Sequence, residues 1–195
     1  PQLNEQFGTR DLRGFGCDHL VAAIGAAGAL LQYVRNTQRS ALPHLRSLRV
    51  EDRNDSLVLD AATRRNLELE EAASGRREHT LVGVLDHTAT AMGGRLLRRW
   101  VHRPLRDHML LRERHQCSGL LADTGLHTDL HDTLHGIADI ERILARIALK
   151  SARPRDLSGL RDSLGLLPQL QSLLADARDP LLARLNAQIG SHPET

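Results

Sequence analysis

The chain has 195 residues, of which 41% are apolar and 26% charged, so it can bury one large core or one domain and part of another. Its formal net charge of +2 is too small to indicate nucleic-acid binding by itself. No apolar run reaches the roughly 20 residues of a membrane span, and the N-terminus lacks a signal-peptide pattern. Two isolated cysteines, Cys17 and Cys117, make no disulfide framework, and we expect a cytoplasmic protein.

Residue usage excludes two further classes. A phosphate-binding P-loop needs a lysine after spaced glycines, and the only lysine, Lys150, follows a helical pattern without them. Folds that stack nucleic-acid bases need several aromatic side chains, and this chain has four. The start at Pro1, without a methionine, indicates an excerpt from a longer chain.

The first part of the chain is predicted to be irregular, with one helix. Three glycines within residues 1–16 predict loop and turn. Residues 17–33 are rich in alanine and leucine and predict a buried helix, whereas the polar residues 36–55 indicate a connector. Two short strands are expected, over 47–50 and 56–59, as a small hairpin.

From residue 60 onward the pattern becomes helical. Asp60 can accept hydrogen bonds from first-turn amides, which predicts a helix over 61–73. Gly75 suits the end of that helix. Thr80 is the corresponding N-cap candidate for a short helix after it.

The next two helices have clear boundaries. Thr90 is an N-cap candidate for a helix over 91–102, and Pro104 should end it because the residue before a proline is pushed out of helical geometry. Asp107 can cap a further helix that runs to about residue 121.

The clearest amphipathic stretch is 137–149. Five apolar residues recur there at helical spacing and predict a core-facing stripe: Ile137, Ile140, Ile143, Leu144 and Ile147. Pro154 suits the first turn of the following helix, Pro168 should interrupt it, and Asp179 should begin the last one. The sequence therefore predicts a mainly α protein, a multi-helix bundle preceded by a short irregular or small β segment.

A histidine series could hold a metal ion. His127, His131 and His135 are four residues apart and would share one helix face. The same spacing puts them beside core-facing leucines, and no cysteine stands near them. We therefore favour a solvated or boundary face over a metal site.

A second cluster could contact phosphates through five arginines: Arg95, Arg98, Arg99, Arg103 and Arg106. Its spacing equally suits a solvated helix face with ion-pair partners among Asp86, Asp107 and Glu113, and we favour this interpretation.

A third group, Asp139 and Glu141 with Arg142, could indicate acid/base chemistry. Because no nucleophile accompanies them, we prefer ion pairs between helices.

Three segments resemble the middle of the MutS family of DNA mismatch-repair proteins. Residues 57–69, LVLDAATRRNLEL, resemble the stretch that enters its core, or lever, domain. Residues 80–107 resemble the pattern Leu-Asp-x-Thr-x-Thr-x-Met-Gly-x-Arg-Leu-Leu-x-x-Trp followed by Pro-Leu-x-Asp, with Ala91 where many members have proline. Residues 139–157 are similar to the family's Asp-Leu-Glu-Arg, Arg-Ile and Pro-Arg-Asp-Leu series.

Upstream, residues 3–16 and 28–48 resemble the end of the family's connector domain and its exit helix. Residues 119–136 carry no motif. The resemblance thus implies two domains. Residues 1–45 would be the C-terminal end of the connector domain, and 46–195 the N-terminal part of the lever domain (domain III).

The matched residues are expected to be structural rather than catalytic. Four apolar ones are expected to be core anchors: Leu85, Leu96, Leu97 and Trp100. Gly93 should permit close packing or a tight first turn, and Asp86 with Thr88 and Thr90 should satisfy backbone amides between two helices. A charged group should form ion pairs that fix how helices cross: Arg95, Asp139, Glu141, Arg142, Arg155 and Asp156. The other motif positions are Asp60, Asn66 and Pro104.

The resemblance implies a parent protein that is a homodimeric clamp on double-stranded DNA with mismatched bases. The parent would use ATP to become a sliding clamp and recruit MutL. ATP and Mg would bind an ATPase domain outside this segment, so the segment itself would hold no cofactor, metal or catalytic residue. Its expected work is mechanical, as the helical lever that couples the ATPase and DNA-binding domains.

Two alternatives stay open at the level of sequence. One is a MutS paralogue that acts on branched DNA in recombination. The other is a helical interaction module without a nucleic-acid role. A Phe-x-Glu element upstream would favour mismatch repair, and a P-loop downstream would exclude the plain interaction module.

Overall fold

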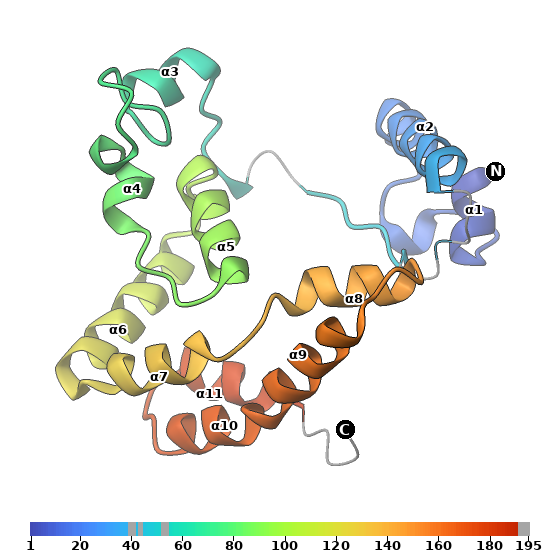
Figure 1. Ribbon diagram of the computed structural model, residues 1–195. Coiled ribbons are helices and arrows are strands. Elements are labelled where there is room, and N and C mark those ends of the chain that lie inside the picture. The colour runs from blue at the N-terminus through green and yellow to red at the C-terminus, as the bar shows by residue number, and fades with distance from the viewer. Residues whose placement is uncertain (39–41, 43–44, 52–54, 191–195) are drawn as a thin grey trace. The chain divides into compact units, whose positions relative to one another are not determined.

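The computed structural model describes residues 1–38, 42, 45–51 and 55–190, and within them the chain is mainly helical (Figure 1). The only β pairing among these residues is an isolated antiparallel bridge between Ser56 and Leu105. The mainly α fold class predicted from the sequence is therefore confirmed.

The chain divides into two compact units. The smaller unit comprises Pro1–Asp52 and Arg142–Arg153, and the larger unit comprises Arg53–Glu141 and Pro154–Thr195. The division crosses the first turn of a helix, so it does not follow a simple N-terminal and C-terminal split. The predicted domain boundary after residue 45 stays a prediction.

The smaller unit begins with a helix that the glycine pattern of residues 1–16 does not predict. Residues 1–16 were expected to be loop and turn, but they form α1 (Gln2–Phe7) and the 3-10 helix η1 (Arg13–Phe15). Gly8 and Gly16 end these elements with φ of 62° and 67°, a conformation that glycine adopts at low cost. The glycines thus mark helix ends and do not prevent helix formation.

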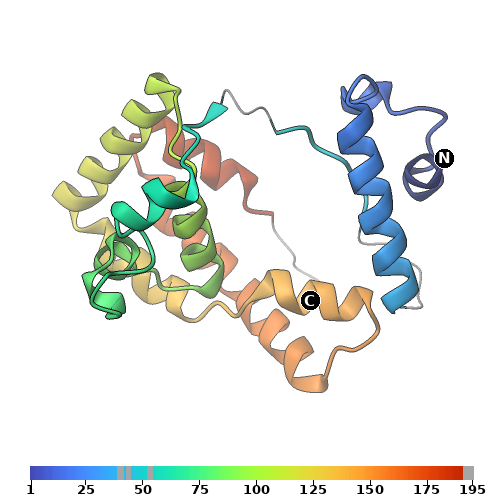
Figure 2. The same ribbon diagram turned by 90° about the horizontal axis from the view of Figure 1, so that it is seen from above.

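Helix α2 (Val21–Gln38) lies beside α1 (Figure 2) and starts later than the predicted residue 17. The core of this unit is a cluster of five buried residues: Leu3, Leu12, Cys17, Leu31 and Leu42. Phe7 and Phe15 pack against this cluster with ring centroids 5.3 Å apart, and Leu149 joins it from the far end of the unit's sequence.

The predicted hairpin is wrong. Residues 47–50 have no regular secondary structure, and part of the connector 36–55 lies outside the described residues. Ser56 pairs instead with Leu105, supported by a hydrogen bond from the Leu57 amide to the Pro104 carbonyl at 2.8 Å. Ser56 therefore pairs with a residue about fifty positions further along the chain. Local sequence patterns do not encode such a contact.

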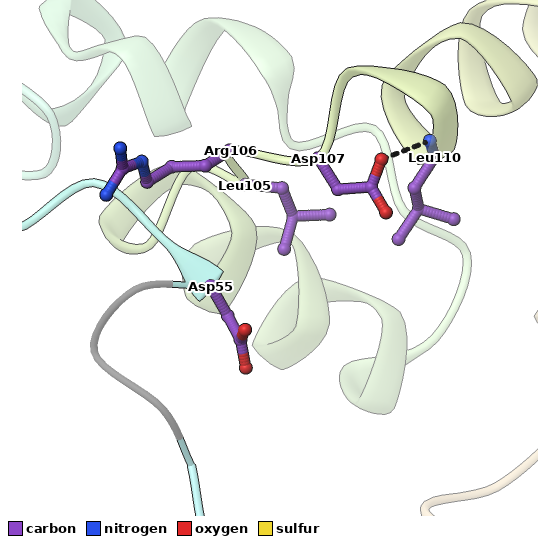
Figure 3. A pocket seen from close by; sticks show the side chains of 5 residues that line it. All are labelled: Asp55, Leu105, Arg106, Asp107 and Leu110. Carbon is purple, nitrogen blue, oxygen red and sulfur yellow. Dashed lines mark hydrogen bonds between the residues drawn. The ribbon is translucent and has the colours of Figure 1, made fainter.

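An open pocket lies beside this bridge (Figure 3) and is lined by Asp55, Leu105, Arg106, Asp107 and Leu110. Its two carboxylates do not form a catalytic pair. Asp107 accepts hydrogen bonds from the amides of Met109 and Leu110, and so serves as a helix cap. The Asp55 side chain points away from Asp107 in Figure 3.

In the larger unit, α3 is shorter than predicted. It covers Ala61–Asn66 rather than 61–73, although Asp60 caps it as expected by accepting from the Thr63 amide at 2.7 Å. The helix stops because Glu68 takes a left-handed conformation, with φ of 47°. The 3-10 helix η3 (Arg77–His79) follows.

Helices α4 (Leu81–Leu85), α5 (Ala91–His102) and α6 (His108–Thr124) begin where predicted. Thr80 accepts from the Gly83 amide at 2.9 Å, and Thr90 accepts from the Gly93 amide at 3.0 Å. The α6 helix continues past the predicted residue 121 because its left-handed cap is Gly125.

The remaining helices complete both units. They are α7 (Leu126–His135), α8 (Ile140–Ala148), α9 (Pro154–Gly165), α10 (Leu167–Ala175) and α11 (Pro180–Gln188). In the larger unit, α6 contacts α7 and α11, while α10 contacts α7, α9 and α11. Their shared core contains buried Cys117, Leu174 and Leu182.

The stripe predicted on α8 is only partly buried. Ile143 is 5% exposed, but Leu144 is 51% and Ile147 37% exposed. The expectation of a continuous core-facing stripe is therefore wrong for these two residues. Amphipathic spacing identifies which residues share a face, but it does not say how much of that face a neighbour covers.

Candidate functional site on helix α5

One face of α5 carries three cationic or potentially cationic side chains, Arg95, Arg98 and His102, at spacings i, i+3 and i+7. Residues at these spacings lie on the same side of an α-helix. Each of the three contacts at least one carboxylate from another segment of the larger unit. The face is thus a row of ion pairs and hydrogen bonds that fixes α5 against its neighbours.

The Arg95 junction has the shortest hydrogen bonds of these contacts. The Arg95 guanidinium donates to both carboxylate oxygens of Asp139 at 2.7 Å, and its Nη2 also donates to Glu141 Oε2 at 2.7 Å. These hydrogen bonds raise the pKa of Arg95 above its usual value. A bidentate arginine–carboxylate pair fixes orientation as well as distance, so it holds α5 in one position against the start of α8.

The second junction is on the next turns of α5. Arg98 donates to Asp86 Oδ2 at 3.0 Å and lies 3.0 Å from Glu70 Oε1 through its Nε. His102 Nε2 lies 2.8 Å from the other oxygen of Glu70. Asp86 was predicted as a partner of the arginine cluster, whereas Glu70 was missed because no local pattern connects it to α5.

The turn between α4 and α5 is organised by Asp86. The Thr88 hydroxyl donates to Asp86 Oδ1 at 2.7 Å, and this bond, followed by the Thr88 amide and the charges of Arg98 and Arg77, lowers the pKa of Asp86. A Cβ placed on Gly93 would lie 3.1 Å from the Thr90 hydroxyl. The close packing expected at Gly93 is therefore present.

The charge of Asp86 should stabilise the larger unit at neutral pH. Because the folded-state pKa is lowered from 3.8, this contribution is present above that value and is lost as pH falls through the folded pKa. We expect Asp86→Asn to cost about 1–2 kcal/mol at pH 7 and less at pH 3, which lies below the unfolded-state pKa of 3.8. Urea denaturation at both pH values measures the difference.

Asp123→Asn is the matched control, since Asp123 is an exposed carboxylate on α6. It should leave the free energy of unfolding within about 0.5 kcal/mol of the parent chain. A cost of Asp86→Asn that is equal at pH 7 and pH 3 would show that the charge of Asp86 does not contribute.

The apolar motif residues are less buried than expected. Leu85 is 48%, Leu96 43% and Trp100 42% exposed, and only Leu97 is half-buried. The core-anchor prediction is thus wrong for the first three within this chain. The guanidinium of Arg114 lies 3.8 Å from the centroid of the Trp100 ring, a cation–π contact that covers part of this face.

The other motif positions occupy boundaries and surfaces. Asn66 ends α3, and the Pro104 carbonyl accepts the Leu57 amide beside the β bridge. Arg142 and Arg155 are exposed, on α8 and in the first turn of α9. Asp156 is buried at 6% exposure in the same turn of α9.

The alternative chemistries considered from the sequence were phosphate contact by the arginine cluster and a metal site on the histidine series. Arg95 and Arg98 are occupied by carboxylates, while Glu113, a suggested partner of the cluster, pairs with Arg184 at 2.6 Å. In the described part of the chain, no group of three His, Cys, Asp or Glu side chains could hold a metal ion.

The histidine series makes ordinary contacts. His127 Nδ1 lies 3.0 Å from the Leu121 carbonyl oxygen. The rings of His131 and His135 pack edge to face, with their centroids 6.1 Å apart. The solvated-face interpretation of the arginine cluster stays a prediction. Within the described residues no helix is both long and apolar enough to cross a bilayer.

Comparison with models of known families gives two matches, in chain order. MutS domain II matches residues 1–46, and MutS domain III matches residues 62–192. The second match alone covers about two thirds of the chain and includes every residue of the α5 junctions described above. The chain therefore belongs to the MutS family.

Proposed function

We propose that this chain is the helical lever region of a DNA mismatch-repair protein that binds mismatched DNA and uses ATP to form a sliding clamp. The observation that carries the proposal is the Arg95 junction, in which one guanidinium joins α5 to two carboxylates 44 and 46 residues away. Membership of the MutS family supplies the context in which such a junction would transmit force.

A lever must keep its shape when one end is displaced. Coupling between distant sites is carried by packed elements that have discrete arrangements, which both sites can bias. Helix α5 contains 12 residues and is about 18 Å long, and α6 contains 17 residues and is about 26 Å long. Ion pairs hold the side of α5, and the core that contains Cys117 holds α6. Helices held in this way can transmit a rotation without bending.

The rest of the proposed activity belongs to other parts of the parent protein. ATP and Mg would bind its ATPase domain, mismatched double-stranded DNA its reading and clamp domains, and MutL the assembled homodimer. This chain contributes the link between them. In that role it needs no catalytic group of its own, and its charged residues serve to hold helices rather than substrate.

The test is Arg95→Ala in the full-length protein. Loss of the guanidinium frees α5 from Asp139 and Glu141, so the effect of ATP on mismatch binding should fall about tenfold, within the usual range of coupling energies. The measured quantity is the ratio of the dissociation constants for mismatched DNA with and without ATP. Arg112→Ala, at an exposed arginine on α6, is the control and should leave the ratio unchanged.

Two outcomes would contradict the proposal. If Arg95→Ala is folded and retains the full effect of ATP on DNA release, the lever role is wrong. If the unsubstituted protein shows no preference for mismatched over branched DNA, the mismatch-repair role gives way to that of a paralogue.

A further inference from the structure

The segment between α3 and η3 is firmly attached to α4. Glu68 and Leu69 accept hydrogen bonds through their carbonyl oxygens from the amides of Leu81 and Val82, each at 3.0 Å. Leu69 is 4% exposed and Val82 is fully buried. The Glu68 carboxylate also accepts from the Ala73 amide at 2.7 Å and closes the turn. Glu70 therefore projects from a fixed backbone.

Glu70 reaches α5 from this fixed position. One carboxylate oxygen lies 3.0 Å from Arg98 Nε and the other 2.8 Å from His102 Nε2. Because these two residues are four positions apart, a single carboxylate spans one turn of the helix. The contact joins the α3–η3 segment to the C-terminal half of α5, whereas Arg95 is nearer the N-terminal half.

His102 depends on this contact for its orientation. Its Nδ1 is buried and has no hydrogen-bond partner in the part of the chain that the structure describes. The Nε2 contact with Glu70 is thus the polar interaction that orients the ring. Glu70, Glu71 and His102 line a cavity of about 250 Å³. Unlike Glu70, Glu71 forms no ion pair in the described structure.

We propose that Glu70 is a positioning residue of the lever, which holds the C-terminal half of α5 through Arg98 and His102. This inference rests on the proposed function and adds a second required contact to it. Arg95 holds the N-terminal half of α5, and Asp86 holds Arg98 from the turn before the helix. Glu70 adds the contact that reaches His102, the last residue of α5, so the helix is also held at its C-terminal end and transmits displacement from either end.

The experiment uses the full-length protein with Glu70→Gln, which removes the charge and nearly preserves the shape. The ratio of dissociation constants for mismatched DNA with and without ATP should fall about two- to tenfold, as expected for the loss of one partly exposed ion pair with Arg98 and one hydrogen bond with His102. Glu71→Gln is the matched control and should leave this ratio unchanged.

A double-mutant cycle tests whether Glu70 acts through the helix. His102→Gln alone should lower the ratio, and adding it to Glu70→Gln should lower the ratio by less than the product of the separate effects. A merely structural role would reduce the melting temperature without changing the ratio. That outcome, or equal effects of Glu70→Gln and Glu71→Gln, would overturn the inference.

The failure of this inference is distinguishable from failure of the proposed function. If Arg95→Ala abolishes the effect of ATP while Glu70→Gln leaves it intact, Glu70 is not a positioning residue and the lever role stands. If neither substitution changes the effect of ATP in a folded protein, both the lever role and the inference fall.

Discussion

Replacing Gly83 by alanine should strongly destabilise the larger unit, at a cost of about 3 kcal/mol or more. A Cβ at this position would overlap the carbonyl oxygen of Arg77 and lie 3.0 Å from the Thr80 hydroxyl. The overlapping atom belongs to the backbone, so no side-chain rotation can relieve it. Either α4 or η3 must move, and the fully buried neighbour Val82 must move with them.

The displacement would also break the local hydrogen bonds. The Thr80 hydroxyl donates to the Arg77 carbonyl at 2.8 Å and accepts from the Gly83 amide at 2.9 Å. Both bonds involve the atoms that lie closest to the added Cβ and that would have to move away from it. Loss of this cap adds about 1 kcal/mol to the steric cost.

Denaturation followed through Trp100 measures the effect of Gly83→Ala, because this single tryptophan lies in the larger unit. Gly119→Ala is the control, since nothing lies within 4 Å of a Cβ built at that position in α6. The control should stabilise the helix by about 0.5–1 kcal/mol. A similar stabilisation by Gly83→Ala would show that η3 does not pack against α4 in solution.

The sequence predicted helix starts better than any other feature. Asp60, Thr80, Thr90, Asp107 and Asp179 all cap the helices expected of them. An N-cap involves a side chain and amides two or three residues away, so the whole interaction is contained in four consecutive residues. Such signals need no knowledge of the tertiary structure.

Helix ends and exposure were predicted less well. The α3 helix stops at Asn66 because Glu68 turns to bond with α4, a partner that the local pattern does not reveal. Likewise, an apolar face shows that Trp100 and Leu96 belong together, but not which segment covers them. Both errors concern contacts between segments rather than the segments themselves.

The candidate site was predicted in part for the same reason. The motif resemblance placed Arg95 with Asp139 and Glu141 as ion-pair candidates, and the structure brings them together. Glu70 belongs to no motif and lies in a segment that was expected to be helical. Its role follows from the position of a loop, which only the folded chain reveals.

Ser163→Ala should cost about 2–3 kcal/mol, a large effect for the loss of one hydroxyl. Ser163 is fully buried on α9, where its Oγ donates to the Gly159 carbonyl at 2.6 Å and accepts from the Ala138 amide at 2.9 Å. Without the hydroxyl, the Ala138 amide loses its acceptor at a partly buried position. An unpaired buried donor costs more than an average hydrogen bond contributes.

Ser158→Ala separates this tertiary contact from the helix itself. Ser158 is exposed on the same helix and also donates to a carbonyl four residues earlier, that of Pro154, at 3.2 Å. Its replacement should change the free energy of unfolding by less than about 0.5 kcal/mol. Comparable costs for the two substitutions in urea denaturation would contradict a special role for the Ala138 contact.

The Ser163 contact bears directly on the α5 site, because Ala138 immediately precedes Asp139, the main partner of Arg95. A hydroxyl on α9 thus fixes the backbone from which that carboxylate projects. Ser163→Ala should therefore weaken the Arg95 junction as well as the fold, and Arg95→Ala should cost less stability in the Ser163→Ala background than alone. Additive costs would mean that α9 and the junction are energetically independent, and that the support of the lever lies elsewhere.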